Sequence, residues 1–298
     1  FGPVLSRRLG LSMGVDLLKY KTCNLDCVYC ELGGTNRLTT CRSRFVPSEL
    51  VLREIHAKKE EPFDHLTFAG SGEPTLSRDL GEIIIKAKEM VDTPVAVITN
   101  STLLTSPAVR KEISAADVVL PSLDAASMDA FQAINRPASG LLIEEIIQGL
   151  KDFRKEFRGE IWLEVMLVKG INEHEAEQIA KAAKSTQPDR IQINTVVRHP
   201  AEPVLPLSEE EMQEMLKIFP GAELIPDWDW SVPTRIHDRL IDLISFNPCT
   251  LGEICDLLNI SNSDAIKYCK IMERDCLISR KLHDNRLFFH ASIKKDNP

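Results

Sequence analysis

The chain has 298 residues, of which 43% are hydrophobic and 27% charged, and its formal net charge is −8. These values are typical of a soluble globular protein with room for one large and one small domain. No apolar run approaches the roughly 18 residues that span a bilayer, so we expect no membrane segment. The acidic balance also disfavours broad binding to nucleic acid, which requires a basic surface.

Two adjacent arginines, Arg7 and Arg8, precede an apolar stretch at residues 11–16 that we expect to form the first strand of a sheet. Guanidinium groups bind carboxylates and phosphates through paired hydrogen bonds. Both arginines are therefore candidates for holding an anionic substrate or a cofactor carboxylate. A solvated basic turn is the alternative interpretation.

Three cysteines, Cys23, Cys27 and Cys30, follow this strand with the spacing C-x3-C-x2-C. Thiolates at this density favour an iron–sulfur cluster or zinc over hard cations. A structural zinc site needs four ligands, and the next cysteine, Cys41, is eleven residues further on. A [4Fe–4S] cluster held by three cysteines leaves one iron free for a small-molecule ligand. Ordinary buried thiols, or a zinc site completed by Cys41, are the alternatives.

A glycine-containing motif directly follows the apolar run at residues 65–69, and it consists of Gly70, Ser71, Gly72, Glu73 and Pro74. Two glycines at the end of a strand allow backbone amides and carbonyls to approach a ligand closely. The proline then fixes the backbone at the start of the next segment. We therefore expect this motif to border a ligand site.

Further apolar stretches at residues 94–100, 117–124, 161–168 and 190–194 alternate with helical patterns, which include 80–88, 143–157, 173–183 and 208–218. This alternation predicts a parallel α/β sheet. The length allows six βα units rather than eight, so we expect a partial, open (β/α)6 TIM-like barrel. Sites in such folds lie at the carboxyl ends of the strands. The candidate residues there are Asn100, Ser122, Asp124, Glu164 and Asn194, although each polar side chain at such a position can instead be an ordinary helix N-cap.

The cysteine motif, with Tyr29 before its last cysteine, and the Gly70–Pro74 motif together resemble the radical S-adenosylmethionine (SAM) superfamily. Residues 2–10 read G-P-V-L-S-R-R-L-G. They resemble the G-P-V-P-S-R-R-L-G opening of a branch that is grouped with wyosine-type tRNA-modifying synthases and largely lacks assigned functions. The resemblance continues through Arg136-Pro137 and residues 194–198.

The resemblance implies an enzyme that binds a [4Fe–4S] cluster through Cys23, Cys27 and Cys30. SAM would bind the fourth iron and be cleaved to methionine and a 5′-deoxyadenosyl radical, which abstracts a hydrogen atom from the substrate. A flavodoxin- or ferredoxin-like donor is implied as the source of the electron. The implied cofactor contacts are Tyr29 for adenine, Gly70, Ser71, Gly72, Glu73 and Pro74 for the methionine amino group, and Asn100, Ser122 and Asp124 for the ribose and carboxylate.

The substrate is not indicated by any motif, and the tentative substrate residues are Arg7, Arg8, Glu164, Asn194 and Arg198. Wyosine synthases need a second cluster from upstream cysteines, and no cysteine precedes Cys23 here, so we do not expect that activity. The acidic composition slightly favours a peptide, protein or metabolite substrate. The alternatives are an RNA- or tRNA-modifying enzyme, and a redox- or SAM-sensing regulator that binds DNA.

We expect the barrel to cover residues 1–230 and a small winged helix-turn-helix domain to cover residues 231–298. Capping patterns predict helices at about 250–258 and 263–274, and strands 278–282 and 287–290 would form the wing. A three-helix cap without a wing is the alternative. If the substrate is RNA, this domain would contact the nucleic acid through Lys267, Lys270, Arg274, Arg280, Lys281 and Arg286; if the substrate is a peptide, protein or metabolite, the domain would serve as a protein-docking module.

Four further cysteines, Cys249, Cys255, Cys269 and Cys276, raise the question of a second cluster. Their helical spacing instead predicts small hydrophobic core residues. A chain with three cysteines in one ligand cluster fits a reducing compartment better than a disulfide framework, so we expect a cytoplasmic location. The proline-rich residues 198–206 are predicted to be extended, as a lid over the barrel or as a connection to helix 208–218.

Overall fold

In the computed structural model, the structure describes residues 1–198 and 200–225 and, towards the C-terminus, 240–241, 243–245, 248–258, 260, 265, 268–269, 272–273, 277–283 and 286–292. Contacts between Cα atoms divide the chain into one unit of residues 3–227 and a second that comprises residues 1–2 and 228–298. The predicted domain boundary at residue 230 lies outside the described residues. Among the described residues no helix is long and apolar enough to cross a membrane.

The larger unit is built on an eight-stranded sheet in the order β1-β2-β5-β6-β7-β8-β9-β10. Every neighbouring pair from β2 to β10 is parallel. The strands are β2 (Gly10–Val15), β5 (His65–Phe68), β6 (Val95–Thr99), β7 (Val118–Pro121), β8 (Glu160–Met166), β9 (Arg190–Asn194) and β10 (Glu223–Leu224). The predicted parallel α/β sheet is confirmed, and all six predicted strands are present.

The edge strand β1 (Val4–Ser6) was not predicted, and it pairs antiparallel with β2. The Ser6 hydroxyl accepts hydrogen bonds from the backbone N–H groups of Arg8 and Leu9, which closes the tight turn between the two strands. A three-residue strand is too short to produce a readable alternation.

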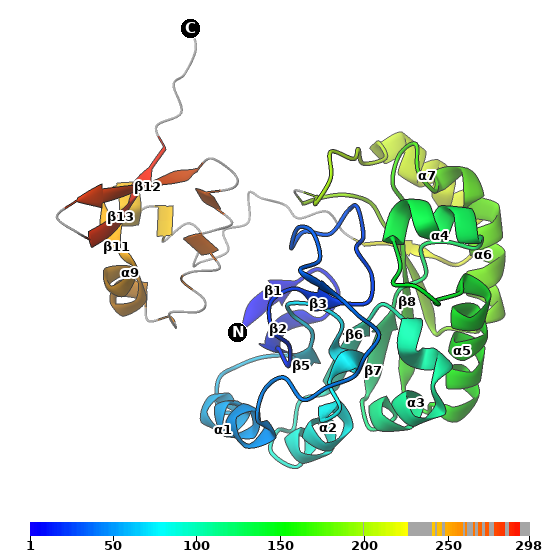
Figure 1. Cartoon of the computed structure of the whole chain (residues 1–298), viewed down its shortest axis with the longest axis horizontal. Helices are drawn as coiled ribbons and strands as arrows, with labels where there is room; N and C mark the ends of the chain where they lie inside the picture. The colour runs from blue at the N-terminus through cyan, green and yellow to red at the C-terminus, as the bar shows by residue number, and fades with distance from the viewer. Residues whose placement is uncertain are drawn as a thin grey trace, which may run out of the picture. The chain divides into compact units, whose positions relative to one another are not determined.

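Helices cover the outer side of the curved sheet, where α1, α2, α3, α5, α6 and α7 follow one another (Figure 1). Their bounds, with that of α4, are α1 (Ser48–Lys58), α2 (Leu80–Lys88), α3 (Pro107–Ile113), α4 (Met128–Asn135), α5 (Ile143–Glu156), α6 (Ala176–Ser185) and α7 (Glu209–Ile218). The helix predicted at 173–183 begins later, because residues Glu173–Glu175 form a 3₁₀ turn, η3. The other short 3₁₀ turns are η1 (Pro74–Leu76) and η2 (Thr102–Thr105).

The strands bury two separate apolar layers because successive side chains point to opposite faces. Val95, Val97 and Val119 pack against the helices in the main core. Ala96, Val118, Leu120, Trp162 and Leu9 form a second cluster, to which Ile98 adds from β6. By this alternation the second cluster marks the inner face of the barrel. Glu164, two residues after Trp162, belongs to the same inner face.

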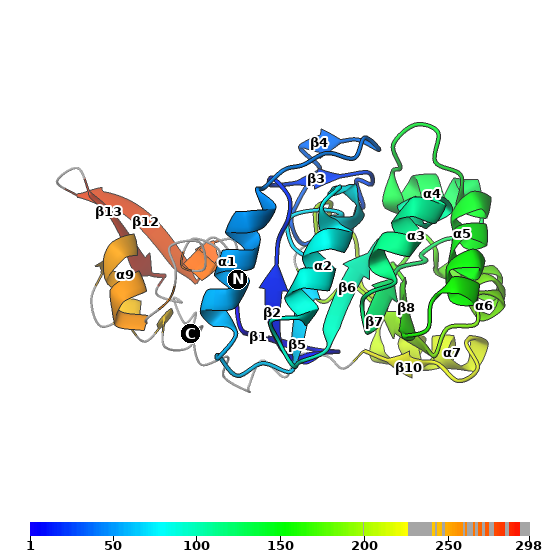
Figure 2. The same ribbon diagram turned by 90° about the horizontal axis from the view of Figure 1, so that it is seen from below.

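A long segment between β2, the first parallel strand, and α1 carries the three cysteines. The cysteine loop, defined here as residues 19–36, includes β3 (Thr22–Cys23), and β3 pairs with β4 (Arg37–Leu38). Figure 2 shows β3 and β4 beyond the end toward which β2 points, so the loop lies at the carboxyl ends of the strands. The site was predicted from the sequence to lie at this edge of the sheet.

The C-terminal unit has its own core of Leu240, Ile244, Cys249, Ile254, Leu258, Ala265, Cys269, Met272, Ile278 and Phe289. It contains β11 (Cys249–Thr250), α9 (Leu251–Leu258), β12 (Ile278–His283) and β13 (Arg286–Ala291), with β13 between the other two strands. The predicted first helix and the two-stranded hairpin are therefore present. Of the predicted helix 263–274 only 265, 268–269 and 272–273 are described, and these are helical. The winged-helix assignment stays a prediction.

Two of the four C-terminal cysteines are confirmed as core residues. Cys249 and Cys269 are buried, and burial raises the pKa of Cys269 to about 12. Cys255 packs against the same core while partly exposed, and Cys276 lies outside the described residues. A thiol whose pKa is raised by apolar burial is inert rather than reactive.

Candidate active site

The cysteine loop is locked to the tip of β5 by a close backbone approach. Thr22 and Gly72 form a bridge, and the Glu73 N–H donates to the Thr22 carbonyl at 3.2 Å. A Cβ atom at position 72 would lie 1.7 Å from the Thr22 oxygen, so no other residue fits without movement of the loop. Gly70, with φ of 148°, approaches Asp16 in a similar way, and Asp16 accepts hydrogen bonds from the backbone and hydroxyl of Ser71.

Glu73 joins the tips of β5 and β6 through a carboxylate that is 2% exposed. One oxygen accepts hydrogen bonds from the Thr75 N–H, the Thr75 hydroxyl and the Thr99 hydroxyl, at 3.0, 2.6 and 2.7 Å. The other accepts from the Asn100 N–H at 2.7 Å. Burial raises the pKa of Glu73, and these hydrogen bonds offset part of that rise.

Asn100 connects the tip of β6 to the first cysteine. Its amide nitrogen donates to Asn24 Oδ1 at 2.6 Å and lies 3.6 Å from the sulfur of Cys23. Asn24 is fully buried and donates in turn to the Thr102 hydroxyl, which donates to Asn100 Oδ1 at 2.8 Å. This closed ring of amide and hydroxyl groups fixes the backbone on one side of Cys23.

Asp124 organises the second cysteine in an equivalent way from the tip of β7. Its carboxylate accepts hydrogen bonds from the Tyr29 hydroxyl and from Asn135 Nδ2, the latter at 2.9 Å, and from the Met166 N–H at 3.0 Å. Asn135 also donates to the sulfur of Cys27 at 3.3 Å. Burial raises the pKa of Asp124 to about 6. The carboxylate therefore links the cysteine loop to β7, β8 and α4.

The third cysteine, Cys30, receives a hydrogen bond of 2.9 Å from the ammonium group of Lys21. Each of the three sulfurs thus has a nitrogen donor beside it: Asn100 for Cys23, Asn135 for Cys27 and Lys21 for Cys30. Donors of this kind stabilise the thiolate form of a metal ligand. Without a metal, burial raises the pKa of Cys23 to about 11 and raises that of Cys27 further still, so metal binding would have to displace the protons.

These contacts are compatible with a cluster held by three separate thiolates. Within the described ranges, which include Cys41, no three Cys, His, Asp or Glu side chains are gathered to hold one metal ion. Thiolates that each bind a different iron at the corners of a cluster do not need to converge on one point.

The tentative substrate residues separate into two groups. Four of them form one network on the inner face: Arg8 pairs with Glu164, Asn194 donates to Glu164 at 2.9 Å, and Arg7 donates to Asn194 at 3.2 Å. Arg198, in contrast, pairs with Glu31, which lies in the cysteine loop.

The proline-rich segment that carries Arg198 runs along the cysteine loop. The Glu202 N–H donates to the Val28 carbonyl at 3.0 Å, and the Glu202 carboxylate pairs with Arg136 at 2.8 Å. Further on, the Lys169 N–H donates to the Leu205 carbonyl. The segment therefore joins β9 to the loop as a bound strap before α7 begins at its Ser208 cap.

A small cavity of about 10 Å³ lies between the cysteine loop and helices α4 and α5. Its lining brings together three predicted residues, Asn100, Ser122 and Asp124, with Leu25, Phe131 and Asn135. The Ser122 carbonyl accepts a hydrogen bond from the Ser101 hydroxyl at 2.6 Å. The strand-tip residues that the sequence selected are thus neighbours.

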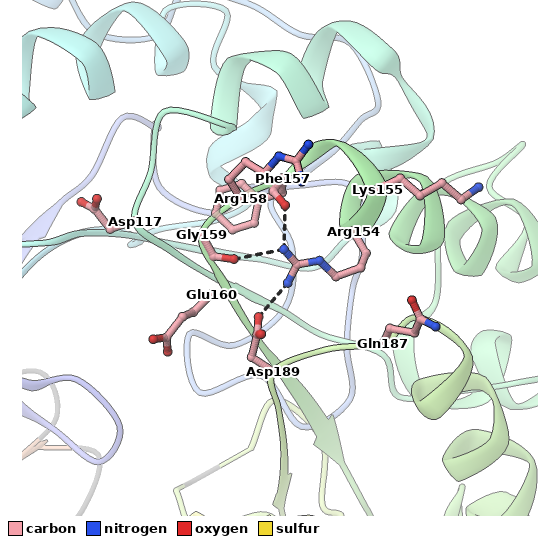
Figure 3. A pocket seen from close by; sticks show the side chains of 9 residues that line it. All are labelled: Asp117, Arg154, Lys155, Phe157, Arg158, Gly159, Glu160, Gln187 and Asp189. Carbon is pink, nitrogen blue, oxygen red and sulfur yellow. Dashed lines mark hydrogen bonds and ion pairs between the residues drawn. The ribbon is translucent and has the colours of Figure 1, made fainter.

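A second hollow lies at the opposite, amino-terminal end of β7, β8 and β9 (Figure 3). Its central Arg154 already donates to Asp189 at 2.7 Å and to the carbonyls of Phe157 and Gly159. These bonds hold the turn between α5 and β8, and they give the hollow a structural explanation.

Three residues of the site were not singled out from the sequence: Lys21, Asn24 and Asn135. Asn24 lies inside the cysteine motif, and Asn135 directly precedes the Arg136-Pro137 pair that carried part of the resemblance. Each was close to a recognised signal. Their roles depend on which sulfur or carboxylate they reach, and that is a property of the folded chain.

A partial α/β barrel with three thiols at the carboxyl ends of its strands defines the class as a cluster-dependent α/β enzyme, and the comparisons identify its family. The Radical SAM superfamily domain matches residues 17–183. A UPF0026 protein of Methanocaldococcus jannaschii is 31% identical over 99% of this chain and 96% of its own length. A GTPase Obg of Brachyspira hyodysenteriae is 40% identical over 74% of this chain. The matched part covers only 33% of the length of that protein.

Among solved structures, a radical SAM methyltransferase from Sphaerobacter thermophilus aligns with a TM-score of 0.56 and 16% identity, over 72% of this chain and 65% of that one. At this identity the likeness concerns the fold. The chain belongs to the Radical SAM superfamily and is a radical SAM enzyme. Members of the superfamily bind a [4Fe–4S] cluster and SAM, and both are cofactors of this protein.

Substitution of Gly72 by Ala is expected to prevent stable assembly of the cluster, because the added Cβ would collide with the Thr22 carbonyl and displace Cys23. The measurement is iron content per chain after anaerobic reconstitution. Gly34→Ala is the matched control in the same loop, where the nearest atom to an added Cβ is 4.0 Å away. Equal iron in both variants would contradict this account of the loop.

Replacement of Glu73 by Gln is expected to lower the free energy of unfolding by about 1–3 kcal/mol, since an amide NH₂ group would face a buried N–H or hydroxyl donor. Chemical denaturation followed by circular dichroism measures the change. Glu54→Gln, at an exposed position on α1, removes the same charge as a control and should change stability far less. A Glu73→Gln variant as stable as the control would show that the four hydrogen bonds are dispensable.

Proposed function

We propose that this enzyme binds its cluster through Cys23, Cys27 and Cys30 and uses it to cleave SAM reductively. The observation that carries the proposal is the set of nitrogen donors directed at the three sulfurs of one loop. When bound, the reduced cluster supplies the electron that cleaves SAM to methionine and a 5′-deoxyadenosyl radical, which removes a hydrogen atom from the substrate. A flavodoxin- or ferredoxin-like protein is the proposed source of that electron.

The chain itself binds and orients SAM at the carboxyl ends of β5, β6 and β7. The backbone of Gly70, Ser71 and Gly72 borders the loop, and we assign it to the methionine end of SAM. Asn100 and Ser122, at the tips of β6 and β7, are the residues that the resemblance assigns to the ribose and carboxylate, and it assigns the ring of Tyr29 to the adenine side. Pro74 fixes the entry to the following 3₁₀ turn, where its φ is suited to the first position.

Glu73 and Asp124 act differently from the direct contacts that the resemblance implies. Each carboxylate is nearly fully buried and already accepts hydrogen bonds from three or more protein groups. Moving either one onto SAM would leave several buried donors without partners. We therefore propose that Glu73 and Asp124 are positioning residues that hold Asn100, Tyr29 and Asn135 in place.

The inner face of the barrel is the proposed substrate chamber. Arg8 and Glu164 have side chains only 14% and 13% exposed, and Asn194 and Arg7 extend the network. Because the arginine is already paired with a carboxylate, the network favours a polar substrate with hydrogen-bonding groups over a strongly anionic one. Arg198 is assigned to the strap, where it fixes the cysteine loop.

We favour a peptide, protein or small metabolite as the substrate. In the described part of the hairpin, Arg280 pairs with Glu273, and Lys281 is the exposed basic residue next to it. Lys267, Lys270 and Arg274, and the side chain of Arg286, lie outside the described residues. An RNA- or tRNA-modifying enzyme and a DNA-binding sensor remain the alternative hypotheses, and a basic surface would be needed for either.

Anaerobic reconstitution with iron and sulfide is expected to give about four irons per chain, as for one [4Fe–4S] cluster. Addition of SAM and dithionite should then yield 5′-deoxyadenosine, measured by chromatography. A Cys27→Ser variant should lose both, while Cys41→Ser, at an exposed thiol outside the site, should keep both. Zinc in place of iron, or no deoxyadenosine from a four-iron protein, would overturn the proposal. Iron near eight would instead indicate a second cluster.

In mobility-shift experiments at low salt, the reconstituted protein is expected not to bind bulk tRNA or duplex DNA, because the net charge of the chain is −8. A basic nucleic-acid-binding protein run in parallel controls for the detection limit. Binding that weakens steeply as salt rises would favour the nucleic-acid alternatives over the peptide or metabolite substrate.

A further inference from the structure

Lys21 is a lysine buried directly beside the cysteines. Lys21 is only 2% exposed, and its ammonium donates hydrogen bonds to Cys30 Sγ at 2.9 Å and to the Gly33 carbonyl at 2.7 Å. The Lys21 carbonyl accepts from the backbone N–H groups of Asn36 and Arg37, both at 3.1 Å. Both the backbone carbonyl and the side-chain ammonium of Lys21 are therefore held by hydrogen bonds.

The ammonium has polar partners but no carboxylate to balance its charge. Among the residues that the structure describes, no Asp or Glu lies within ion-pair distance of Lys21. Burial of a cation away from water is costly unless an anion compensates it. A carbonyl and a thiol are both neutral, so the position of Lys21 indicates that an anion belongs beside Cys30.

The other two cysteines have neutral donors. Asn100 lies beside Cys23 and Asn135 beside Cys27, and both are amides. The polar surroundings of the three thiols are therefore unequal, with the positive charge at the Cys30 side.

We propose that Lys21 is a positioning residue that holds the Cys30 thiolate and makes the cluster easier to reduce. This inference rests on the proposed function, and it concerns the first step of that function, which is the one-electron reduction of the cluster. A three-thiolate [4Fe–4S] cluster is an anion and supplies the charge that Lys21 lacks. Hydrogen bonds to the sulfurs and the local charge are established determinants of cluster potential.

The electron balance gives the direction of the effect. One electron enters from the external one-electron donor, no proton is taken up, and the cluster becomes more negative by one unit. The fixed positive charge of Lys21 stabilises the reduced form more than the oxidised form. Removal of that charge therefore shifts the midpoint potential to more negative values.

The test compares Lys21→Met with Lys19→Met in the full-length, reconstituted protein. Lys19 is exposed two residues earlier in the same loop, so the control removes the same charge without the buried hydrogen bond. The readouts are iron per chain and a potentiometric titration followed by electron paramagnetic resonance. At the wild-type midpoint we expect the ratio of reduced to oxidised cluster to fall about threefold to tenfold in Lys21→Met, with no comparable change in Lys19→Met.

Lys21→Gln separates the charge from the hydrogen bond, and it also serves if Lys21→Met does not fold. The inference is supported if the midpoint potential of Lys21→Gln lies between those of wild type and Lys21→Met. It is also supported if a folded Lys21→Met retains less iron than Lys19→Met. Four irons with an unchanged midpoint in the folded Lys21 variants overturns it, while the proposed function stands. A wild-type protein that assembles no cluster overturns both.

Discussion

The site depends on the contact between the cysteine loop and the tip of β5, where the Thr22 carbonyl lies so close to Gly72 that no side chain fits between them. Glu73, the next residue, accepts hydrogen bonds from the tip of β6. Two adjacent residues therefore fix a loop on one side and a neighbouring strand on the other. A loop of many residues loses much conformational entropy when it is ordered, and this contact limits where its three cysteines can lie.

The parallel sheet supplies two different environments from the same strands. Residues that face the helices, such as Val97 and Val119, form an apolar core, whereas the inner face changes from apolar to polar along β8, from Trp162 to Glu164. The apolar part stabilises the fold. The polar part, two residues nearer the carboxyl ends, lies where parallel α/β folds place their sites. One alternating pattern thus determines both the stability of the barrel and the position of the proposed substrate chamber.

The sequence predicted the six central strands and the cysteine motif, because buried parallel strands are continuous apolar runs and thiolate spacing is a local property. It did not predict β1, whose three residues carry no periodic signal, or the later start of α6. The sequence predicted that polar side chains at the strand tips lie together, and Asn100, Ser122 and Asp124 are neighbours in the structure. Their hydrogen-bond partners were not predicted, because Asp124 and Asn135 meet only when β7 and α4 pack against the cysteine loop. Lys21 gave no signal in sequence, since a lysine beside a cysteine motif is ordinarily exposed.

The charges around the three cysteine sulfurs cannot be predicted from the sequence, yet they bear most directly on the reduction of the cluster. Burial is the main reason why the pKa values of the Cys23 and Cys27 thiols are raised, and the carboxylates of Glu73 and Asp124, which hold the strand tips, add to the rise. A cation beside the thiols would favour the more negative, reduced form of the cluster. Lys21 supplies a positive charge at Cys30. Its ammonium donates hydrogen bonds to Cys30 Sγ and to the Gly33 carbonyl, and not to Glu73 or Asp124. We therefore infer that the buried ammonium of Lys21 offsets the negative charge of the buried acids at the tips of β5 and β7.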